Sequence, residues 1–302
     1  GADVTDERGH AKAVAQAAGA AHHDVAFGES DFWTLLPAIA AAMDDPAADY
    51  AALPTYKLAA EARRAGLKVV LSGEGGDELF GGYGRYRRAG RPWFLGGRPM
   101  RAKGVFDGLG VLREPPAGWR DGIARAENDA ALPGRTRLQT AQATDCADWL
   151  PNDLLTKLDR CLMAHGVEGR VPFLDVRLAD FAFRLPDPLK MRHGRGKWLL
   201  RRWLETGLPA SKPFSRKRGF TVPVGEWIGG RGAALGPLVA RQPGIREICL
   251  PGAVETLYRN AGTGRGQKAG QAAWVLLFYA LWHRRHVQGL DPTGGVFDVL
   301  AG

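Results

Sequence analysis

The sequence predicts an α/β protein in which helices alternate with the strands of a parallel sheet. Segments of helical length alternate with short apolar runs of strand length over roughly the first 80 residues. In addition, the β-branched run at residues 67–71 leads directly into a glycine-rich loop. Ligands of parallel sheets bind beyond the carboxyl ends of the strands. The loop after residue 71 is therefore the first candidate for a functional site.

The pattern of apolar residues and breakers places each element in order. Alanine enrichment predicts the first helix, an acidic start predicts the second, and Gly66 ends the third. The expected elements are a helix at 7–18, a strand at 22–27, a helix at 31–43, a helix at 53–65 and a strand at 67–71.

The pattern changes after Tyr83. Residues 90–118 are rich in Arg, Pro and Gly, which indicates a surface excursion, and from residue 124 onward the pattern is mainly helical. The tail after residue 289 has the composition of a loose end. One late stretch predicts a helix with a buried face, formed by Trp274, Leu277, Phe278, Leu281 and Trp282.

The loop itself carries the chemistry. It reads Ser72, Gly73, Glu74, Gly75, Gly76, Asp77 and opens into a predicted helix. Glycines allow close backbone approach, and the N–H groups at a helix start attract anions such as phosphate. Because carboxylates repel phosphate, the arrangement favours a divalent metal between them. The alternative is a tight turn in which Asp77 only caps the helix.

Composition limits the class of protein. The chain has 302 residues, 45% of them hydrophobic, and the longest apolar run, at 272–282, is too short to cross a bilayer. Cys146, Cys161 and Cys249 are far apart and odd in number, which favours a reducing compartment over disulfides or a zinc site. We therefore expect no membrane partner.

The net charge of +9 raises the question of nucleic-acid binding. The excess arginine concentrates between residues 184 and 218, where Trp198 and Trp203 lie among leucines at helical spacing. These aromatics are therefore expected in a core and not on a stacking surface. A triphosphate ligand or a solvated face accounts for the arginines equally well, so we expect no nucleic-acid partner.

Several long motifs occur in a family-specific order. They are residues 53–56 (Leu-Pro-Thr-Tyr), the loop and helix at 72–83, residues 155–175, Gly196-Lys197, and residues 217–223. Together they resemble the synthetase domain of glutamine-dependent asparagine synthetases, from the first residues to about His286. The resemblance implies an ATP-pyrophosphatase-like (adenine nucleotide alpha hydrolase-like) parallel-sheet core within residues 1–90. Residues 91–302 would then form a mainly helical part that completes the active site.

The sequence departs from the family at its start. The family's domain begins with a strand and an SGGxDS pyrophosphate loop, preceded by a glutaminase domain with an N-terminal cysteine, and the printed chain begins at Gly1 without them. We interpret it as N-terminally truncated. On this interpretation the chain alone lacks half of its ATP site, binds metal poorly and is inactive by itself.

The resemblance implies an amide-forming ligase. ATP activates the side chain of aspartate as β-aspartyl-AMP with release of pyrophosphate, and ammonia derived from glutamine then displaces AMP. The expected cofactors are ATP and Mg²⁺, the expected location is the cytoplasm, and a homodimer is left open. Two alternatives remain: a related ligase, of the β-lactam-synthetase type, that acts on another carboxylic acid, or a non-catalytic scaffold.

The resemblance also assigns roles to residues. Glu74 corresponds to the proton-handling residue, Lys197 to the lysine that stabilises phosphate charge, and Asp77 to a metal ligand. Asp49 lies where the family frames its substrate amino acid. The remaining candidates for ATP or pyrophosphate contacts are Ser72, Gly73, Gly75, Gly76, Lys157 and Arg170. Lys157 has a simpler alternative, an ion pair with Glu168 or Asp159.

Overall fold

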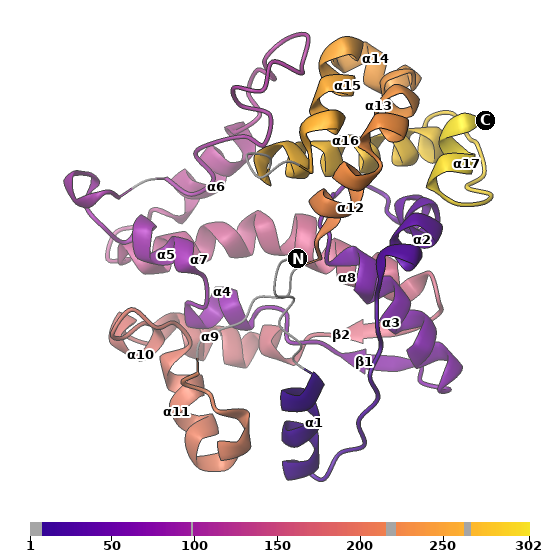
Figure 1. Cartoon of the computed structure of the whole chain (residues 1–302). Helices are drawn as coiled ribbons and strands as arrows, with labels where there is room; N and C mark the ends of the chain where they lie inside the picture. The colour runs from indigo at the N-terminus through magenta and orange to yellow at the C-terminus, as the bar shows by residue number, and fades with distance from the viewer. Residues whose placement is uncertain (1–7, 98, 216–221, 263–266) are drawn as a thin grey trace.

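The computed structural model describes residues 8–97, 99–215, 222–262 and 267–302. Helices dominate, and a two-stranded parallel sheet lies among them (Figure 1). In chain order the elements are α1 (Arg8–Ala17), α2 (Glu29–Ala42), α3 (Ala52–Arg64), β1 (Val69–Leu71), α4 (Gly76–Phe80), α5 (Gly84–Ala89), η1 (Trp93–Leu95), α6 (Asp121–Ala130), α7 (Arg137–Ala147), η2 (Leu150–Leu155), α8 (Thr156–Met163), β2 (Glu168–Arg170), η3 (Pro172–Leu174), α9 (Val176–Arg184), α10 (Asp187–Lys190), α11 (Trp198–Gly207), η4 (Pro209–Ser211), α12 (Val224–Gly230), α13 (Gly232–Ala240), α14 (Pro243–Ile248), α15 (Pro251–Asn260), α16 (Gln267–His286) and α17 (Val296–Ala301).

The sheet fixes the position of the glycine-rich loop. β1 and β2 run parallel, with Val69 opposite Glu168 and Leu71 opposite Arg170. Helix α8 packs against β2 and against α3, and together they bury a small apolar cluster, which consists of Ala59, Leu158, Leu162 and Val167 with Val70 and Val171 at its edge. The predicted parallel α/β arrangement is thus confirmed at β1, although helix predominates in the part of the chain that the structure describes.

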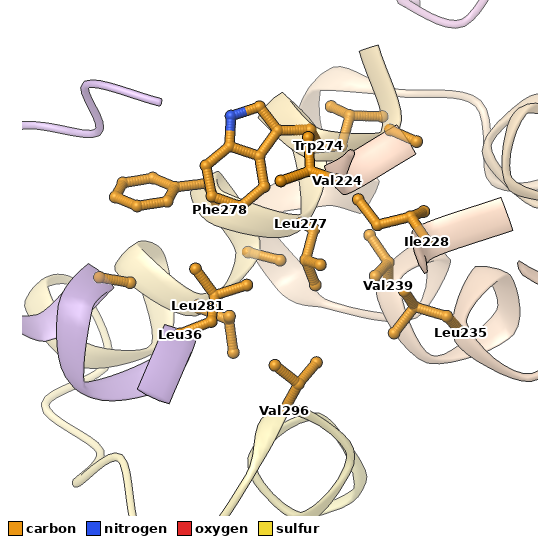
Figure 2. Packing of buried hydrophobic residues seen from close by; sticks show 14 of the residues in the cluster. Leu36, Val224, Ile228, Leu235, Val239, Trp274, Leu277, Phe278, Leu281 and Val296 are labelled. Atoms are coloured by element: carbon orange, nitrogen blue, oxygen red, sulfur yellow. The ribbon is translucent and has the colours of Figure 1, made fainter. Parts of the chain in front are cut away.

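The largest core lies among the C-terminal helices. α16 supplies Trp274, Leu277, Phe278 and Leu281, which pack against Leu36 of α2 and against apolar side chains of α12, α13 and α17 (Figure 2). Trp282 lies at the edge of this core, where its indole N–H donates to the carbonyl oxygen of Met43 at 3.0 Å. The predicted apolar stripe of the late helix is confirmed.

The strand predicted at 22–27 is wrong. Residues 21–28 form neither helix nor strand, and His22 Nε2 instead contacts Asp24 Oδ1 at 2.9 Å. A strand persists only where a neighbour satisfies its backbone N–H and C=O groups. In the described sheet β1 pairs with β2, and residues 22–27 do not pair with either strand. Their alternating pattern alone does not create a strand.

The tail predicted to be loose after residue 289 is ordered near its end. Val296, Val299 and Leu300 of α17 are buried against the core that contains α2. Arg241 Nη2 donates to the carbonyl oxygens of Leu300 and Ala301 at 3.0 and 2.8 Å, which satisfies backbone acceptors at the helix end. The i, i+3, i+4 spacing of these buried residues is typical of a helix with one apolar face, but the overall composition of the tail indicated a loose end.

The expectation that Trp203 belongs to a core is also wrong. Its side chain is 70% exposed on α11. Trp198, five residues earlier, is only partly exposed and makes an edge contact with Phe214 at a centroid distance of 5.2 Å. Helical spacing identifies residues that share a face, but whether another element covers that face depends on the tertiary structure.

Candidate active site at the end of strand β1

The loop after β1 is held at the carboxyl end of the sheet by its backbone. The Ser72 N–H donates to the carbonyl oxygen of Arg170 at 2.8 Å, which continues the pairing of β1 with β2 by one residue. Gly75 then adopts a φ of +88°, and a Cβ on it would lie 2.3 Å from Leu174 Cδ2. Only glycine fits this turn without strain. The sequence therefore makes a sharp change of direction from strand to helix.

α4 begins at Gly76 and carries Asp77 in its first turn. Gly75, with its left-handed backbone, is the residue before the helix, so the alternative reading of Asp77 as the helix cap is wrong. Instead, Asp77 Oδ1 lies 3.1 Å from Lys197 Nζ. Two motifs that are 120 residues apart in the sequence therefore meet at this helix start.

Glycines create the space in which Lys197 reaches Asp77. A Cβ on Gly82 would lie 1.7 Å from Asp77 Oδ1 and 2.7 Å from Lys197 Cε, and a Cβ on Gly196 would lie 2.0 Å from the carbonyl oxygen of Gly81. The backbone N–H of Lys197 donates to the carbonyl oxygen of Phe80 at 2.9 Å, while its φ is +56°. The chain around Lys197 is thus pressed against the end of α4.

A second lysine lies beside the other loop carboxylate. Lys157 Nζ is 2.9 Å from Asp49 Oδ2 and 3.7 Å from Glu74 Oε1, and the Lys157 side chain is only 6% exposed. Burial opposes the charge of Lys157, but the attraction of Asp49, Glu74 and Asp153 outweighs it and raises the pKa of the lysine. The simpler pairing of Lys157 with Glu168 or Asp159 is not what the structure shows.

Asp153 also belongs to the group of charged side chains around Lys157, and it was not identified from the sequence. It lies in η2, a π-helical turn that runs directly into α8, four residues before Lys157. Burial and then the negative charge of Asp49 raise its pKa to about 7, and its Oδ2 atom is buried without a hydrogen-bond partner. The i, i+4 spacing to Lys157 is the sequence signal that points to it.

Arg170 contributes to the loop in a different way from the one expected. Its carbonyl oxygen accepts the Ser72 N–H, but its guanidinium is paired with Glu168 Oε1 at 2.9 Å and its side chain is 62% exposed. A phosphate contact by Arg170 therefore requires its side chain to leave Glu168. Residues 217–221, the first part of the motif that begins with Lys217, lie outside the residues that the structure describes.

A basic cavity of about 440 Å³ adjoins the pair of Asp77 and Lys197. Gly82 and Gly196 form part of its wall, and Arg87, Arg195 and Arg201 line it as well. Such a concentration of guanidinium groups beside glycine backbone suits a ligand with several negative charges. The composition of the cavity thus agrees with the triphosphate explanation of the arginine excess.

The donor set at the loop suits a phosphate-bridged metal better than a metal held by protein alone. No group of three or more His, Cys, Asp or Glu side chains able to hold a metal ion occurs in the described ranges. Mg²⁺ is commonly held by one or two carboxylates, with substrate phosphates and water as the other ligands. Asp77, already close to a cation, fits the role of such a single carboxylate.

Two carboxylates, Glu74 and Asp77, thus lie close together in sequence at the edge of a parallel sheet, each beside its own lysine. The family model described as asparagine synthase matches residues 2–284, and the chain belongs to this family.

Similar proteins carry names from the same family. The chain is 31% identical over 318 residues to a putative glutamine-hydrolysing asparagine synthetase of Mycobacterium tuberculosis (strain ATCC 25618 / H37Rv), covering 92% of this chain and 48% of the relative. It is 31% identical over 258 residues to asparagine synthetase 1 of Bacillus subtilis (strain 168), covering 72% and 40%. For asparagine synthetase B of Escherichia coli (strain K12), the identity is 28%, covering 72% and 32%. The chain thus spans half or less of the length of these relatives.

Proposed function

We propose that the natural protein is an ATP-dependent ligase that converts aspartate into asparagine, with glutamine as the source of ammonia. One observation carries the proposal: Glu74 and Asp77 leave the same loop but meet different lysines, Lys157 at 3.7 Å and Lys197 at 3.1 Å. A two-step reaction needs two such environments, one for phosphate charge and one for proton transfer. Membership of the asparagine synthase family and the names of the relatives support the choice of substrate.

The first step places negative charge beside Lys197. An oxygen of the aspartate side chain attacks the α-phosphorus of ATP, the bond to the bridging oxygen breaks, and pyrophosphate leaves. Cations that approach the phosphate oxygens stabilise this transition state. Lys197 and the arginines of the adjoining cavity supply them, and the loop backbone at Gly73 and Gly75 is proposed to add N–H donors, since the N–H groups of Ser72 and Gly76 already donate to the carbonyl oxygens of Arg170 and Gly73.

The second step needs a base. Ammonia attacks the activated carbonyl carbon, and the resulting cationic nitrogen must lose a proton before the carbon–oxygen bond to AMP breaks. Glu74, one-quarter exposed at the end of the strand, is placed to accept that proton. Asp49 and Lys157, which contact each other beside Glu74, are proposed to frame the amino-acid substrate.

We propose Mg²⁺ as the metal, with Asp77 as its protein ligand. When bound, the ion would neutralise charge on the phosphate oxygens of ATP. The fold proposed for the region around β1 is the ATP-pyrophosphatase-like core, whose sheet the described residues represent by two parallel strands.

A cytoplasmic location agrees with the chemistry of the cysteines. Cys146, Cys161 and Cys249 are all free thiols, and burial raises the pKa of each. Protonated, buried thiols are inert residues of a core and suit a reducing environment. Within the described ranges, no helix combines the length and apolar character needed to cross a membrane.

The proposal is tested by exchange of labelled pyrophosphate into ATP, measured in the natural protein with and without aspartate. Exchange that requires aspartate, together with asparagine formed from glutamine, is the expected result. Exchange that requires a different carboxylic acid would instead favour the related ligases, and an absence of exchange with every carboxylic acid would favour the scaffold. Replacing Lys197 by Ala should lower the exchange by at least about a hundredfold, since the step loses its nearest cation.

A further inference from the structure

The helix that carries Asp77 is too short to satisfy its own backbone. α4 spans only Gly76–Phe80, so the carbonyl groups of residues 77–80 accept no hydrogen bond from within it. The carbonyl oxygen of Asp77 accepts from the turn that follows, where the Gly82 N–H donates at 2.7 Å. The other three accept from residues 142 and 197, which are far away in the sequence.

Gln142 of α7 supplies the donors for two of these carbonyl groups. Its side chain is 1% exposed, and its Nε2 atom donates to the carbonyl oxygen of Glu78 at 2.5 Å and to that of Leu79 at 2.8 Å. The nitrogen of a primary amide carries two N–H groups, so one is present for each carbonyl oxygen. A single buried side chain therefore ties α7 to the end of α4.

Lys190 fixes which end of this amide faces α4. The lysine side chain is fully buried at the end of α10, and its Nζ atom donates to Gln142 Oε1 at 3.1 Å. An ammonium group is a donor only, so it takes the amide oxygen and leaves the amide nitrogen to the carbonyl groups. Rotating the amide by half a turn would set the donors of Gln142 and Lys190 against each other.

The same end of α4 is joined to the chain around Lys197. The carbonyl oxygen of Phe80 accepts the Lys197 N–H at 2.9 Å, next to the carbonyl oxygen of Leu79 that Gln142 holds. The first turn of the helix places Asp77 Oδ1 at 3.1 Å from Lys197 Nζ. Because five residues make little more than one helical turn, a shift at one end of α4 is carried directly to Asp77.

We propose that Gln142 is a positioning residue, which is oriented by Lys190 and sets the position of α4 and thereby the distance between Asp77 and Lys197. The inference rests on the proposed function only in assigning that pair to the phosphate step. Glu78 and Leu79 are both buried, so removal of the amide leaves two carbonyl oxygens without donors and without water. α4 then moves to reduce this cost, and Asp77 moves with it.

The direct test is amide hydrogen exchange in Gln142→Met, which keeps the length of the side chain and removes its N–H groups. The amides of Gly82 and Lys197 report on α4, because they donate to its carbonyl oxygens. The amide of Glu168, which donates to the carbonyl oxygen of Lys68 at 2.8 Å, reports on the sheet. We expect protection of the first two to fall by at least about tenfold, while that of Glu168 stays within about twofold of wild type.

Gln139→Met is the matched control variant. Gln139 lies three residues earlier on the same helix, and its Nε2 atom donates to the carbonyl oxygen of Phe183 at 3.1 Å and not to α4. If Gln142→Met fails to fold, Gln142→Glu takes its place, because an ionised carboxylate pairs with Lys190 but offers α4 no N–H group. Unchanged protection of the two α4 reporters in a folded variant, or an equal loss in Gln139→Met, would overturn the proposal.

Exchange of pyrophosphate into ATP, measured in the natural protein, separates positioning from general loosening of the fold. Gln142→Met should lower the aspartate-dependent rate by at least about tenfold, but by less than about twofold when Lys197 is already replaced by Ala, because the pair that it positions is then absent. Equal losses in both backgrounds would contradict the proposal. If the wild-type protein shows no exchange that requires aspartate, the proposed function fails, whereas amide exchange still decides whether Gln142 holds α4.

Discussion

Lys197 can pair with Asp77 only because the residue beside both of them, Gly82, has no side chain. The two charged atoms are 3.1 Å apart, and a Cβ on Gly82 would lie only 1.7 Å from Asp77 Oδ1 and 2.7 Å from Lys197 Cε. The site therefore depends on a residue that has no side chain of its own. The electrostatic arrangement is set by the backbone as much as by the charged residues.

Replacing Gly82 by Ala should disrupt this pair. The added methyl group forces Asp77 or Lys197 to move, at a cost of about 1–3 kcal/mol in the free energy of unfolding. Urea unfolding measures the loss. Gly122 of α6 is the matched control, because a Cβ there meets nothing within 4 Å and alanine favours the helix. Equal stability of Gly82→Ala and Gly122→Ala would show that the gap is not as tight as described.

Replacing Lys157 by Met should be strongly destabilising. The change leaves Asp49, Glu74 and Asp153 without their shared cation, and breaking a buried pair costs about 3–5 kcal/mol. The raised pKa of Lys157 means that its contribution is complete below its ordinary value of 10.5 and disappears only at higher pH, so the deficit persists through the neutral range. Thermal unfolding at pH 7 measures it.

The control for Lys157 is Lys57, which pairs with Asp31 at 2.7 Å but is partly exposed. Partly exposed pairs contribute about 1 kcal/mol or less, so Lys57→Met should have a small effect. The difference between the two variants isolates the contribution of the cluster. Similar losses in both would mean that the surroundings of Lys157 are not special.

Asp153 gives a pH dependence of stability with a defined sign. Its pKa is raised from 3.8 to about 7, so the unfolded chain releases this proton at lower pH than the folded chain does. The group therefore lowers stability progressively as the pH rises from about 4 to about 7, by up to a few kcal/mol. Asp153→Asn abolishes this contribution.

Relative to wild type, Asp153→Asn should accordingly gain stability between pH 4 and pH 7 and then level off. Unfolding by urea at several pH values measures the difference, with Asp159→Asn as the exposed control. A difference that does not change with pH would show that Asp153 ionises as an ordinary aspartate.

The C-terminal helix should contribute to the core. Leu300→Ala removes a buried side chain of α17 and should cost about 2–5 kcal/mol, whereas Leu290→Ala alters an exposed residue and should cost little. Chemical denaturation distinguishes them. Loss of equal size in both variants would contradict the docking of α17 against α2.

Sequence patterns predicted those features whose backbone conformation depends on residues close together in the sequence. The β-branched run before Ser72 predicted β1, the glycines predicted the sharp turn, and the apolar repeat from Trp274 to Leu281 predicted the buried face of α16. In each case the feature follows from neighbours in the sequence. The partner of β1 was not predicted, because β2 (Glu168–Arg170) lies in a part of the chain whose pattern indicated mainly helix.

The features that the sequence did not predict depend on tertiary contacts. Residues 22–27 have a strand pattern but no strand, and Trp203 is exposed although Leu199 and Leu200 of the same helix pack against a buried cluster. Lys157 pairs with Asp49, more than a hundred residues away in the sequence, and not with the carboxylates nearest to it in the sequence. Asp153 was overlooked because a single aspartate in a Pro-Asn-Asp turn gives no sign of burial until α8 and the loop at Glu74 are placed beside it.

The most direct measurement compares the two steps in the natural protein after Glu74→Gln. The central claim is that the loop separates phosphate chemistry, beside Lys197, from proton transfer, at Glu74. Aspartate-dependent exchange of pyrophosphate into ATP should remain within a few-fold of wild type, while asparagine formation should fall by about 10²- to 10⁴-fold. Equal loss of both activities, or unchanged formation of asparagine, would contradict the account.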